Sequence, residues 1–125
     1  MNVKIDTKEK FTIFTPSDSP ITANMTVEFK DLLLANLQNP VPHVILNFKQ
    51  VDQVDNQIAD MLSEIQQLYY EKNCSFIVCE LQKEVKLQLD ERNILELMNT
   101  TPTESEAWDV VQMEEIEREL LNDDE

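Results

Sequence analysis

The sequence contains no glycine among its 125 residues. Loops that cradle phosphate groups, such as GxxxxGK(S/T) and GxGxxG, need glycine where the backbone takes positive φ or approaches the ligand closely. The GxSxG turn that presents a nucleophilic serine has the same requirement. We therefore exclude nucleotide-binding and hydrolase sites of these usual kinds.

Basic residues are also few. Lys and Arg number 10 against 25 Asp and Glu, which gives a formal net charge of −15. Such a charge repels nucleic-acid phosphates and anionic membrane surfaces, so we expect a protein partner and no nucleic acid. The charge is uneven, because residues 104–125 hold ten acidic residues and one basic residue, Arg118.

Cysteine and histidine are scarce as well. Cys74 and Cys79 are five residues apart across a predicted strand, and this spacing points the two thiols to opposite faces, so we expect no disulfide. His43 is the only histidine, which argues against a zinc site and favours a residue at the edge of a strand. No motif indicates a cofactor, a metal site or catalytic residues, and we expect no enzyme.

Long apolar runs are missing too. No stretch approaches the roughly 20 apolar residues of a membrane-spanning helix, and the N-terminus MNVKIDTKEKF lacks the apolar run of a secretory signal. We therefore expect a soluble, cytoplasmic protein without direct membrane insertion.

The first part of the chain alternates between strand and helix patterns. Short alternating runs at Val3–Asp6 and Phe11–Phe14 predict a hairpin, and Thr15–Pro20 is rich in turn formers. Apolar residues from Asn24 to Gln38 recur at nearly helical spacing. Val44–Phe48 is almost continuously apolar, which is typical of a strand buried on both faces near the middle of a sheet.

The middle of the chain predicts a parallel βαβ unit. A strongly periodic helix covers Ile58–Tyr69, with Asp55 before it as a plausible N-cap, and the apolar strand Phe76–Cys79 follows. A strand, a helix and a strand over about 35 residues are typical of a right-handed parallel crossover. Lys83–Arg92 favours a short helix, although its apolar spacing also fits a strand, and Ile94–Met98 predicts an edge strand.

A last helix is predicted after Pro102. Thr103 and Glu106 match the S/T-x-x-E capping box that opens many helices. Residues at steps of 3, 3, 3 and 4 predict one apolar stripe laid on the domain: Ala107, Val110, Met113, Ile116 and Leu120. We expect one domain over residues 1–121 and a frayed acidic tail over 122–125, because acidic groups oppose the dipole at a helix C-terminus.

This order of elements resembles the STAS domain, the fold of bacterial anti-sigma-factor antagonists. The resemblance lies in three stretches, VILNFKQVDQVDNQIADMLSEIQQLYYEKN, CSFIVCEL and TPTESEAWDVV. It implies an α/β fold with a mixed β-sheet of four to five strands, a central parallel βαβ unit, about four helices and an acidic C-terminal helix.

The loop before the strongest helix departs from that family. Antagonists switched by phosphorylation have Asp-Ser-Ser/Thr-Gly there, and the serine takes the phosphate. This chain has Asp55-Asn56-Gln57-Ile58, so Asn56 holds the phospho-acceptor position without a hydroxyl. We expect the usual switch to be absent, and Ser63 is a weaker alternative phosphosite.

The resemblance also suggests a partner-docking surface. Asn56, Asp60, Ser63 and Gln67 follow one another at steps of 4, 3 and 4, which places them on one polar helix face. With Asp55 and Gln57 they form the predicted docking face, beside the loop from Ser17 to Thr22. The ordinary alternatives are a solvated helix surface and, for Asp55, a simple N-cap.

The function implied by the resemblance is regulatory protein binding in bacterial signalling. The implied partner is an anti-sigma factor or a related kinase-type regulator, bound constitutively. One alternative is an accessory subunit bound to the ATPase of a membrane transporter. Another is a homodimer formed through the last helix and Trp108, since exposed aromatic and aliphatic patches are common in interfaces.

Overall fold

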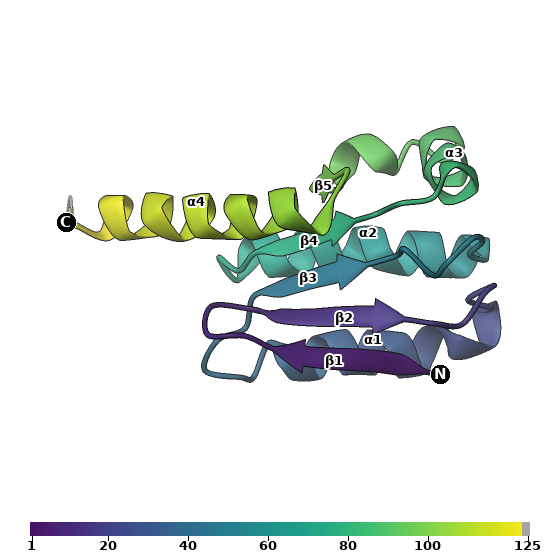
Figure 1. Cartoon of the computed structure of the whole chain (residues 1–125), viewed down its shortest axis with the longest axis horizontal. Helices are drawn as coiled ribbons and strands as arrows, with labels where there is room; N and C mark the ends of the chain where they lie inside the picture. The colour runs from purple at the N-terminus through teal and green to yellow at the C-terminus, as the bar shows by residue number, and fades with distance from the viewer. Residues whose placement is uncertain (124–125) are drawn as a thin grey trace.

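A five-stranded sheet organises the computed structural model, which describes residues 1–123, in the order β1-β2-β3-β4-β5 (Figure 1). β1 pairs antiparallel with β2, and all later neighbours pair in parallel. The hairpin and the parallel βαβ unit are thereby confirmed, and the fold is a mixed α/β one. The strands are β1 (Val3–Thr7), β2 (Thr12–Pro16), β3 (Val44–Asn47), β4 (Phe76–Cys79) and β5 (Thr100–Thr101).

The central strand β3 is buried on both faces, as its continuous apolar run predicts. Ile45 pairs with Ile77 of β4, and both side chains are fully buried. Val44 and Leu46 point to the opposite face, because successive residues of a strand alternate. The sheet therefore has two apolar faces, and each needs a covering layer.

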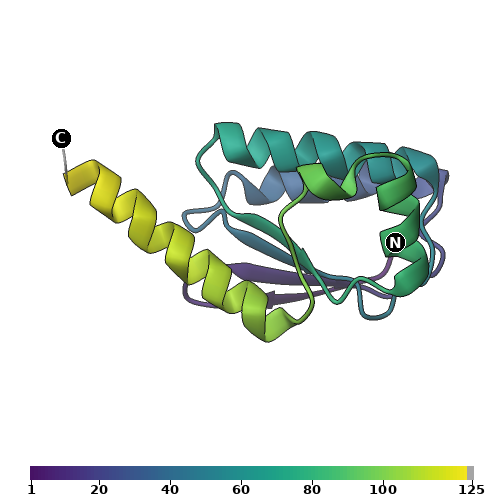
Figure 2. The same ribbon diagram turned by 90° about the horizontal axis from the view of Figure 1, so that it is seen from above.

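Three helices build the larger core on one face of the sheet. They are α1 (Thr26–Asn36), α2 (Asn56–Glu71) and α3 (Lys83–Glu91), with short 3₁₀ turns η1 (Ala23–Met25) and η2 (Leu95–Leu97). Figure 2 shows α1 and α2 side by side above the sheet. The hydroxyl of buried Tyr69 in α2 donates a hydrogen bond of 2.6 Å to the Leu33 carbonyl of α1, which ties the two helices together.

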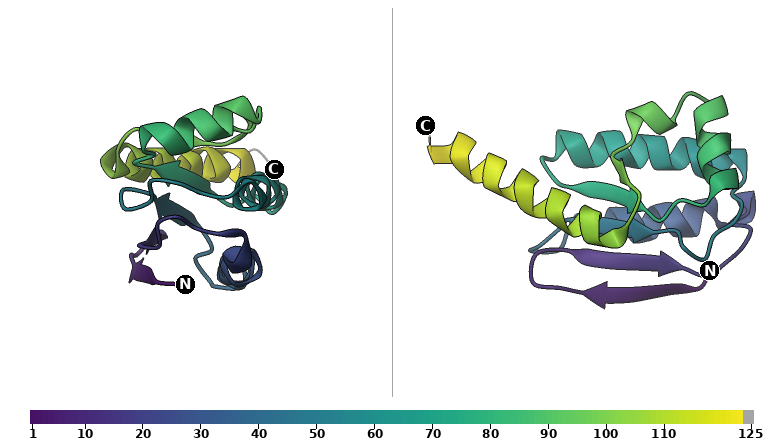
Figure 3. Two further views of the ribbon diagram at one scale, coloured as in Figure 1. Left: turned by 90° about the vertical axis from the view of Figure 1, so that its right-hand side faces the viewer. Right: turned by 45° about the horizontal axis from the view of Figure 1, so that its top comes forward.

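The last helix, α4 (Glu104–Asp123), covers the opposite face of the sheet. Its Ala107 and Val111 are fully buried against strand residues. The Trp108 ring packs edge-on against the Phe11 ring, with the two ring centroids 4.9 Å apart. The helix then runs past the end of the sheet into solvent (Figures 2 and 3). Of the expected frayed tail, α4 includes residues 122 and 123, and residues 124–125 lie outside the described part of the chain.

The prediction of one apolar stripe laid on the domain is wrong for the second half of α4. Met113, Ile116 and Leu120 are 59%, 56% and 59% exposed. The cause is the helical period, because steps of exactly three residues fall short of 3.6 and drift around the helix. The stripe therefore leaves the sheet, and Val111 takes the inner position instead.

The predicted edge strand at Ile94–Met98 is also wrong. This segment forms η2, and the edge strand is the shorter β5 at Thr100–Thr101. Ile94 and Met98 are both buried, which a helical turn achieves at a spacing of four residues and a strand also allows. The sequence pattern therefore could not distinguish a helical turn from a strand at this segment.

Three tight turns use left-handed backbone without glycine. Asn73, Glu80 and Asn93 have φ values of 59°, 58° and 59°. Asparagine tolerates this region better than most residues, whereas glutamate does not. The carboxylate of Glu80 accepts a hydrogen bond of 2.8 Å from the Glu104 backbone N–H, so this strained turn also holds the first residue of α4.

Candidate functional site

Asp55 joins the start of α2 to the segment that precedes α1. It occupies the N-cap position of α2, as predicted, but its side chain makes no capping hydrogen bond. Instead its Oδ2 accepts a hydrogen bond of 2.6 Å from the backbone N–H of Ala23. The prediction that Asp55 caps α2 with its side chain is therefore wrong. The carboxylate instead links the start of α2 to Ala23, the first residue of η1.

Asn56 and Asp60 both lie next to α3. The exposed Asn56 accepts a hydrogen bond of 3.0 Å from Gln88, and Asp60 pairs with Arg92 through contacts of 2.6 and 2.8 Å. Asn56 and Asp60 are four residues apart on α2, and so are Gln88 of α3 and Arg92, the residue that follows α3, so the two contacts link α2 to the α3 segment. The amide at position 56 is thus exposed and held in place.

The other predicted residues occupy the rest of the exposed side of α2. Gln57 is exposed and Ser63 is half-buried, while exposed Gln67 donates a 3.2 Å hydrogen bond to Glu71. Asn56 and Asp60 therefore border α3, whereas Gln67 lies further along the helix. The helical spacing placed these residues correctly along α2 but gave no information about which neighbour each would contact.

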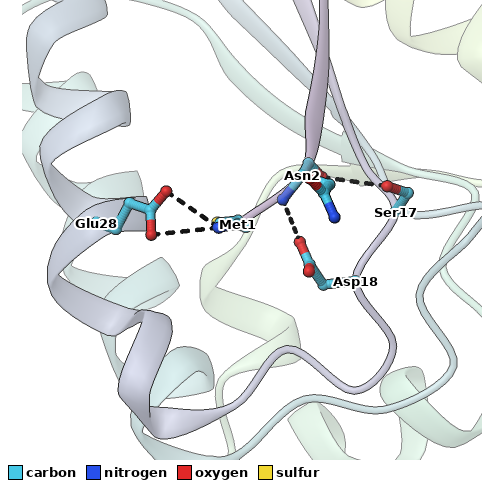
Figure 4. Close-up of polar contacts among 5 residues, drawn as sticks. All are labelled: Met1, Asn2, Ser17, Asp18 and Glu28. Atoms are coloured by element: carbon cyan, nitrogen blue, oxygen red, sulfur yellow. Dashed lines mark hydrogen bonds and ion pairs between the residues drawn. The ribbon is translucent and has the colours of Figure 1, made fainter.

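The loop from Ser17 to Thr22 lies beside the start of α2. Ile21 forms a parallel bridge with Val54, and Ser19 hydrogen-bonds to Asp52. Figure 4 shows how the chain start fixes this loop: Asn2 donates its backbone N–H to Asp18 at 2.6 Å and accepts from the Ser17 hydroxyl at 3.3 Å. The same figure shows the Met1 amino group 3.2 Å from a carboxylate oxygen of Glu28 on α1.

An open acidic hollow lies next to this loop and α3. Leu87 is 45% exposed there. Acidic and polar residues make up the rest of the lining: Asp52, Gln53, Glu84, Gln88 and Glu91. The sequence argument missed α3 as a contributor, because the ambiguous spacing of Lys83–Arg92 gave no fixed face. An apolar residue within an acidic rim suits a protein surface that carries basic groups.

A second polar cluster fastens the middle of α4 to the end of the sheet. The Ser75 hydroxyl donates to Glu114 at 2.6 Å and accepts from Arg118 at 3.1 Å. His43 Nδ1 accepts the Ser75 backbone N–H at 3.0 Å. Burial lowers the pKa of His43, and the nearby Arg118 guanidinium lowers it further. The sequence predicted only a strand-edge residue at His43. It did not reveal the contacts with Ser75 and Arg118, because these residues are distant along the chain.

The thiols are protonated and free. Burial raises the pKa of Cys79 to about 12, and it also raises the pKa of Cys74. The two cysteines form no disulfide and lie against different faces of the sheet, as their spacing predicts. Within residues 1–123, no group of His, Cys, Asp and Glu side chains forms a metal site. Over the same residues, every helix is too short or too polar to cross a membrane.

Comparison with known families gives one match. A family model described as STAS domain matches residues 2–107, which is most of the chain. Among curated proteins, none matches this sequence significantly.

Several solved structures share the fold. A candidate anti-sigma factor antagonist from Thermotoga maritima has a TM-score of 0.79 at 16% identity, over 88% of this chain and 94% of that one. A variant of RsbS from Moorella thermoacetica has a TM-score of 0.75 at 18% identity, over 90% and 96%. A murine anion transporter of the solute carrier 26 family has a TM-score of 0.71 at 16% identity, over 83% of this chain and 18% of the transporter. At these identities the likeness establishes the fold.

Proposed function

The chain belongs to the STAS domain family, and on that basis we propose that it is a cytoplasmic, protein-binding regulatory module of the anti-sigma-factor-antagonist type. The observation that carries this proposal is the exposed polar surface at the start of α2. Its partner is an anti-sigma factor or a related kinase-type regulator. No step of this function requires a cofactor or catalysis by this chain.

The docking face in this proposal combines α2, α3 and the neighbouring loop. Asp55, Asn56, Gln57, Asp60 and Ser63 supply polar groups, and Leu87 supplies an apolar centre. The carboxylates around it favour a partner with a basic patch, since complementary charge increases the rate of association and excludes wrong partners. The contacts of Asn56 and Asp60 with α3 hold the face in one conformation, which lowers the entropy lost on binding.

We further propose that serine phosphorylation does not control this face. An amide at position 56 has no hydroxyl to accept a phosphoryl group. A phosphoserine there would add roughly 1.5 to 2 negative charges among carboxylates that already surround the site. Binding is then constitutive and depends on the amounts of the two proteins.

The proposal on phosphorylation is tested by giving the chain a hydroxyl. We expect Asn56→Ser to be labelled by the cognate kinase and ATP, and the natural protein to stay unlabelled in this loop. Asn56→Glu, which adds charge alone, should weaken partner binding at least about tenfold. Phosphate found on the natural loop would contradict the proposal.

The docking face is tested by affinity capture from the native cytosol. We expect Asp60→Lys to lose one specific partner, because it reverses a charge and breaks the pair with Arg92. Glu9→Lys is the matched control, since it makes the same charge change in the exposed turn before β2, at the other end of the sheet. Equal capture by both variants would remove α2 from the interface.

The family also leaves open a role as accessory subunit of a transporter ATPase. The fold does not separate the two roles, because a transporter-borne domain has it too. The same capture experiment separates them by its product. A membrane-associated ATPase complex would support the accessory subunit, whereas a regulator that stays in the supernatant after ultracentrifugation would support the antagonist-type module.

A further inference from the structure

The second half of α4 presents a row of apolar side chains to solvent. Met113, Ile116 and Leu120, here called the outer stripe, are each more than half exposed. Their spacing of three and four residues places them on one helix face. Adjacent large apolar side chains form a patch, and patches of this kind mark interaction sites more often than single exposed residues do.

The outer stripe points away from the domain. Each helical residue turns the chain by about 100°, so residues two positions apart lie nearly opposite each other. Met113 stands in this relation to buried Val111. Ile116 and Leu120 each lie two positions from Arg118 and therefore nearly opposite it on the helix. The Arg118 guanidinium reaches inward and donates a hydrogen bond of 3.1 Å to the Ser75 hydroxyl. The contacts that fasten α4 therefore hold the outer stripe outward.

The outer stripe also lies beyond the part of the chain that defines its family. The family match ends at Ala107, and the outer stripe begins six positions later. The sheet and its covering helices do not use these side chains. Their apolar character therefore has no explanation in the packing of the domain.

The charges beside the outer stripe select its occupant. In heptad notation Met113, Ile116 and Leu120 occupy a, d and a, so Glu117 is at e and Glu119 at g. Both glutamates are exposed, and within residues 1–123 neither carboxylate has an ion pair or hydrogen bond. A second copy would bring acidic flanks together without a basic residue at e or g, and each copy carries a net charge of −15.

We propose that the outer stripe docks an amphipathic helix of a partner protein whose apolar seam is flanked by Lys or Arg. The apolar seams bury each other, and the basic flanks pair with Glu117 and Glu119. This surface is separate from the docking face, which lies at the start of α2 and on α3, whereas α4 approaches only the far end of α2, where Gln67 and Glu117 line one hollow. The proposal therefore stands or falls independently of the proposed function.

The test uses the full chain and a designed probe. The probe is a three-heptad helical peptide with Leu at a and d and Lys at e and g, and its matched control has Glu at e and g. Fluorescence anisotropy at about 0.15 M salt should give saturable one-to-one binding of the Lys peptide, with the Glu peptide at least about tenfold weaker. Backbone amide shifts on binding should concentrate at residues 109–121.

Variants of the chain separate stripe binding from general attraction to an acidic protein. We expect the double change Ile116→Ser and Leu120→Ser to weaken the Lys peptide at least about tenfold. Val27→Ser is the control, because Val27 is an exposed apolar residue on α1, at 71% exposure, and should leave binding unchanged. All these side chains are exposed, so thermal melts should agree among the variants.

Three outcomes overturn the proposal. The first is equal binding of the Lys peptide to the natural chain and the double variant, which would mean attraction to charge alone. The second is equal binding of the Lys and Glu peptides. The third is a dimer in sedimentation equilibrium that Ile116→Ser dissolves, which would assign the outer stripe to a second copy of this chain.

Discussion

At the scale of the residue, the contacts of His43 depend on its protonation state. Its Nδ1 accepts the Ser75 backbone N–H, and its Nε2 lies 3.4 Å from the Arg118 guanidinium. An imidazolium carries N–H groups on both nitrogens, so protonation removes the acceptor and places a positive charge beside Arg118. Glu115 acts in the opposite direction on the pKa of His43, but burial and Arg118 outweigh it.

His43 should make stability fall in mild acid. Its pKa in the folded chain lies below the ordinary value of 6.5, so the unfolded chain binds the proton more strongly. The free energy of unfolding is then fully retained above about pH 6.5 and decreases as the pH falls through that value toward the folded pKa. Urea unfolding between about pH 8 and 5 measures this decrease.

His43→Asn is the control for this prediction. The Asn side chain keeps an acceptor near the Ser75 N–H and does not titrate. We expect the natural chain to lose more stability than the variant over the same pH range. Identical slopes for the two chains would show that the carboxylates alone set the pH dependence.

The sequence placed single residues better than it placed their partners. The helical period located Asn56 and Asp60 on α2 and one turn apart, because that depends only on local spacing. Their bonds to Gln88 and Arg92 depend on how α3 packs, which no local pattern encodes. Asp55 illustrates the same point, since the N-cap position was predictable and its bond to Ala23 was not.

At the scale of the element, α4 depends on how it begins. The Thr103 hydroxyl accepts a hydrogen bond of 3.2 Å from the Glu106 backbone N–H, which is one half of the predicted capping box. The Glu106 carboxylate accepts from the same hydroxyl at 3.2 Å and not from the Thr103 backbone N–H. The Glu80 carboxylate accepts the N–H of Glu104 at 2.8 Å. Two of the backbone N–H groups left unpaired at any helix start are therefore bonded by side chains.

Removing the first of these caps should destabilise the protein measurably. We expect Thr103→Ala to lower the free energy of unfolding by about 1 kcal/mol, the usual cost of losing an N-cap hydroxyl. Ser105→Ala, two residues further along, is the matched control: its side chain is exposed, and alanine favours the helix. Urea unfolding of both variants checks the difference, and equal effects would exclude a capping role for Thr103.

Elements with a strong, uniform period were predictable, and elements with a mixed period were not. α2 buries Ile58, Leu62, Ile65 and Tyr69 on one face, which its spacing indicates. The segment at 94–98 is short and apolar apart from Glu96, so only its packing made it a 3₁₀ turn. α4 was found correctly, but its drifting stripe concealed that Met113, Ile116 and Leu120 face solvent.

At the scale of the whole molecule, negative charge opposes the folded state. The net charge is −15, and residues 119–125 contribute four acidic groups: Glu119, Asp123, Asp124 and Glu125. Self-repulsion of this kind is greater in a compact chain than in an extended one. Salt screens it, because the Debye length falls from about 30 Å at 0.01 M to about 8 Å at 0.15 M.

Stability should therefore increase with sodium chloride. We expect the melting temperature to rise between about 0.01 and 0.15 M salt, by about 4 °C for each roughly 1 kcal/mol of repulsion that is screened. A chain lacking residues 119–125 should show a smaller rise, since it carries less charge and loses only exposed apolar side chains, Leu120 and Leu121. Differential scanning calorimetry measures both, and an equal rise would contradict the prediction.

The projecting half of α4 also affects how the molecule moves through water. The helix has 20 residues and is about 30 Å long, and its C-terminal end extends beyond the sheet (Figure 2). An elongated particle experiences more friction than a sphere of equal mass. A single copy should thus elute early from a gel-filtration column and give an inflated apparent mass, whereas light scattering reports the mass of one chain.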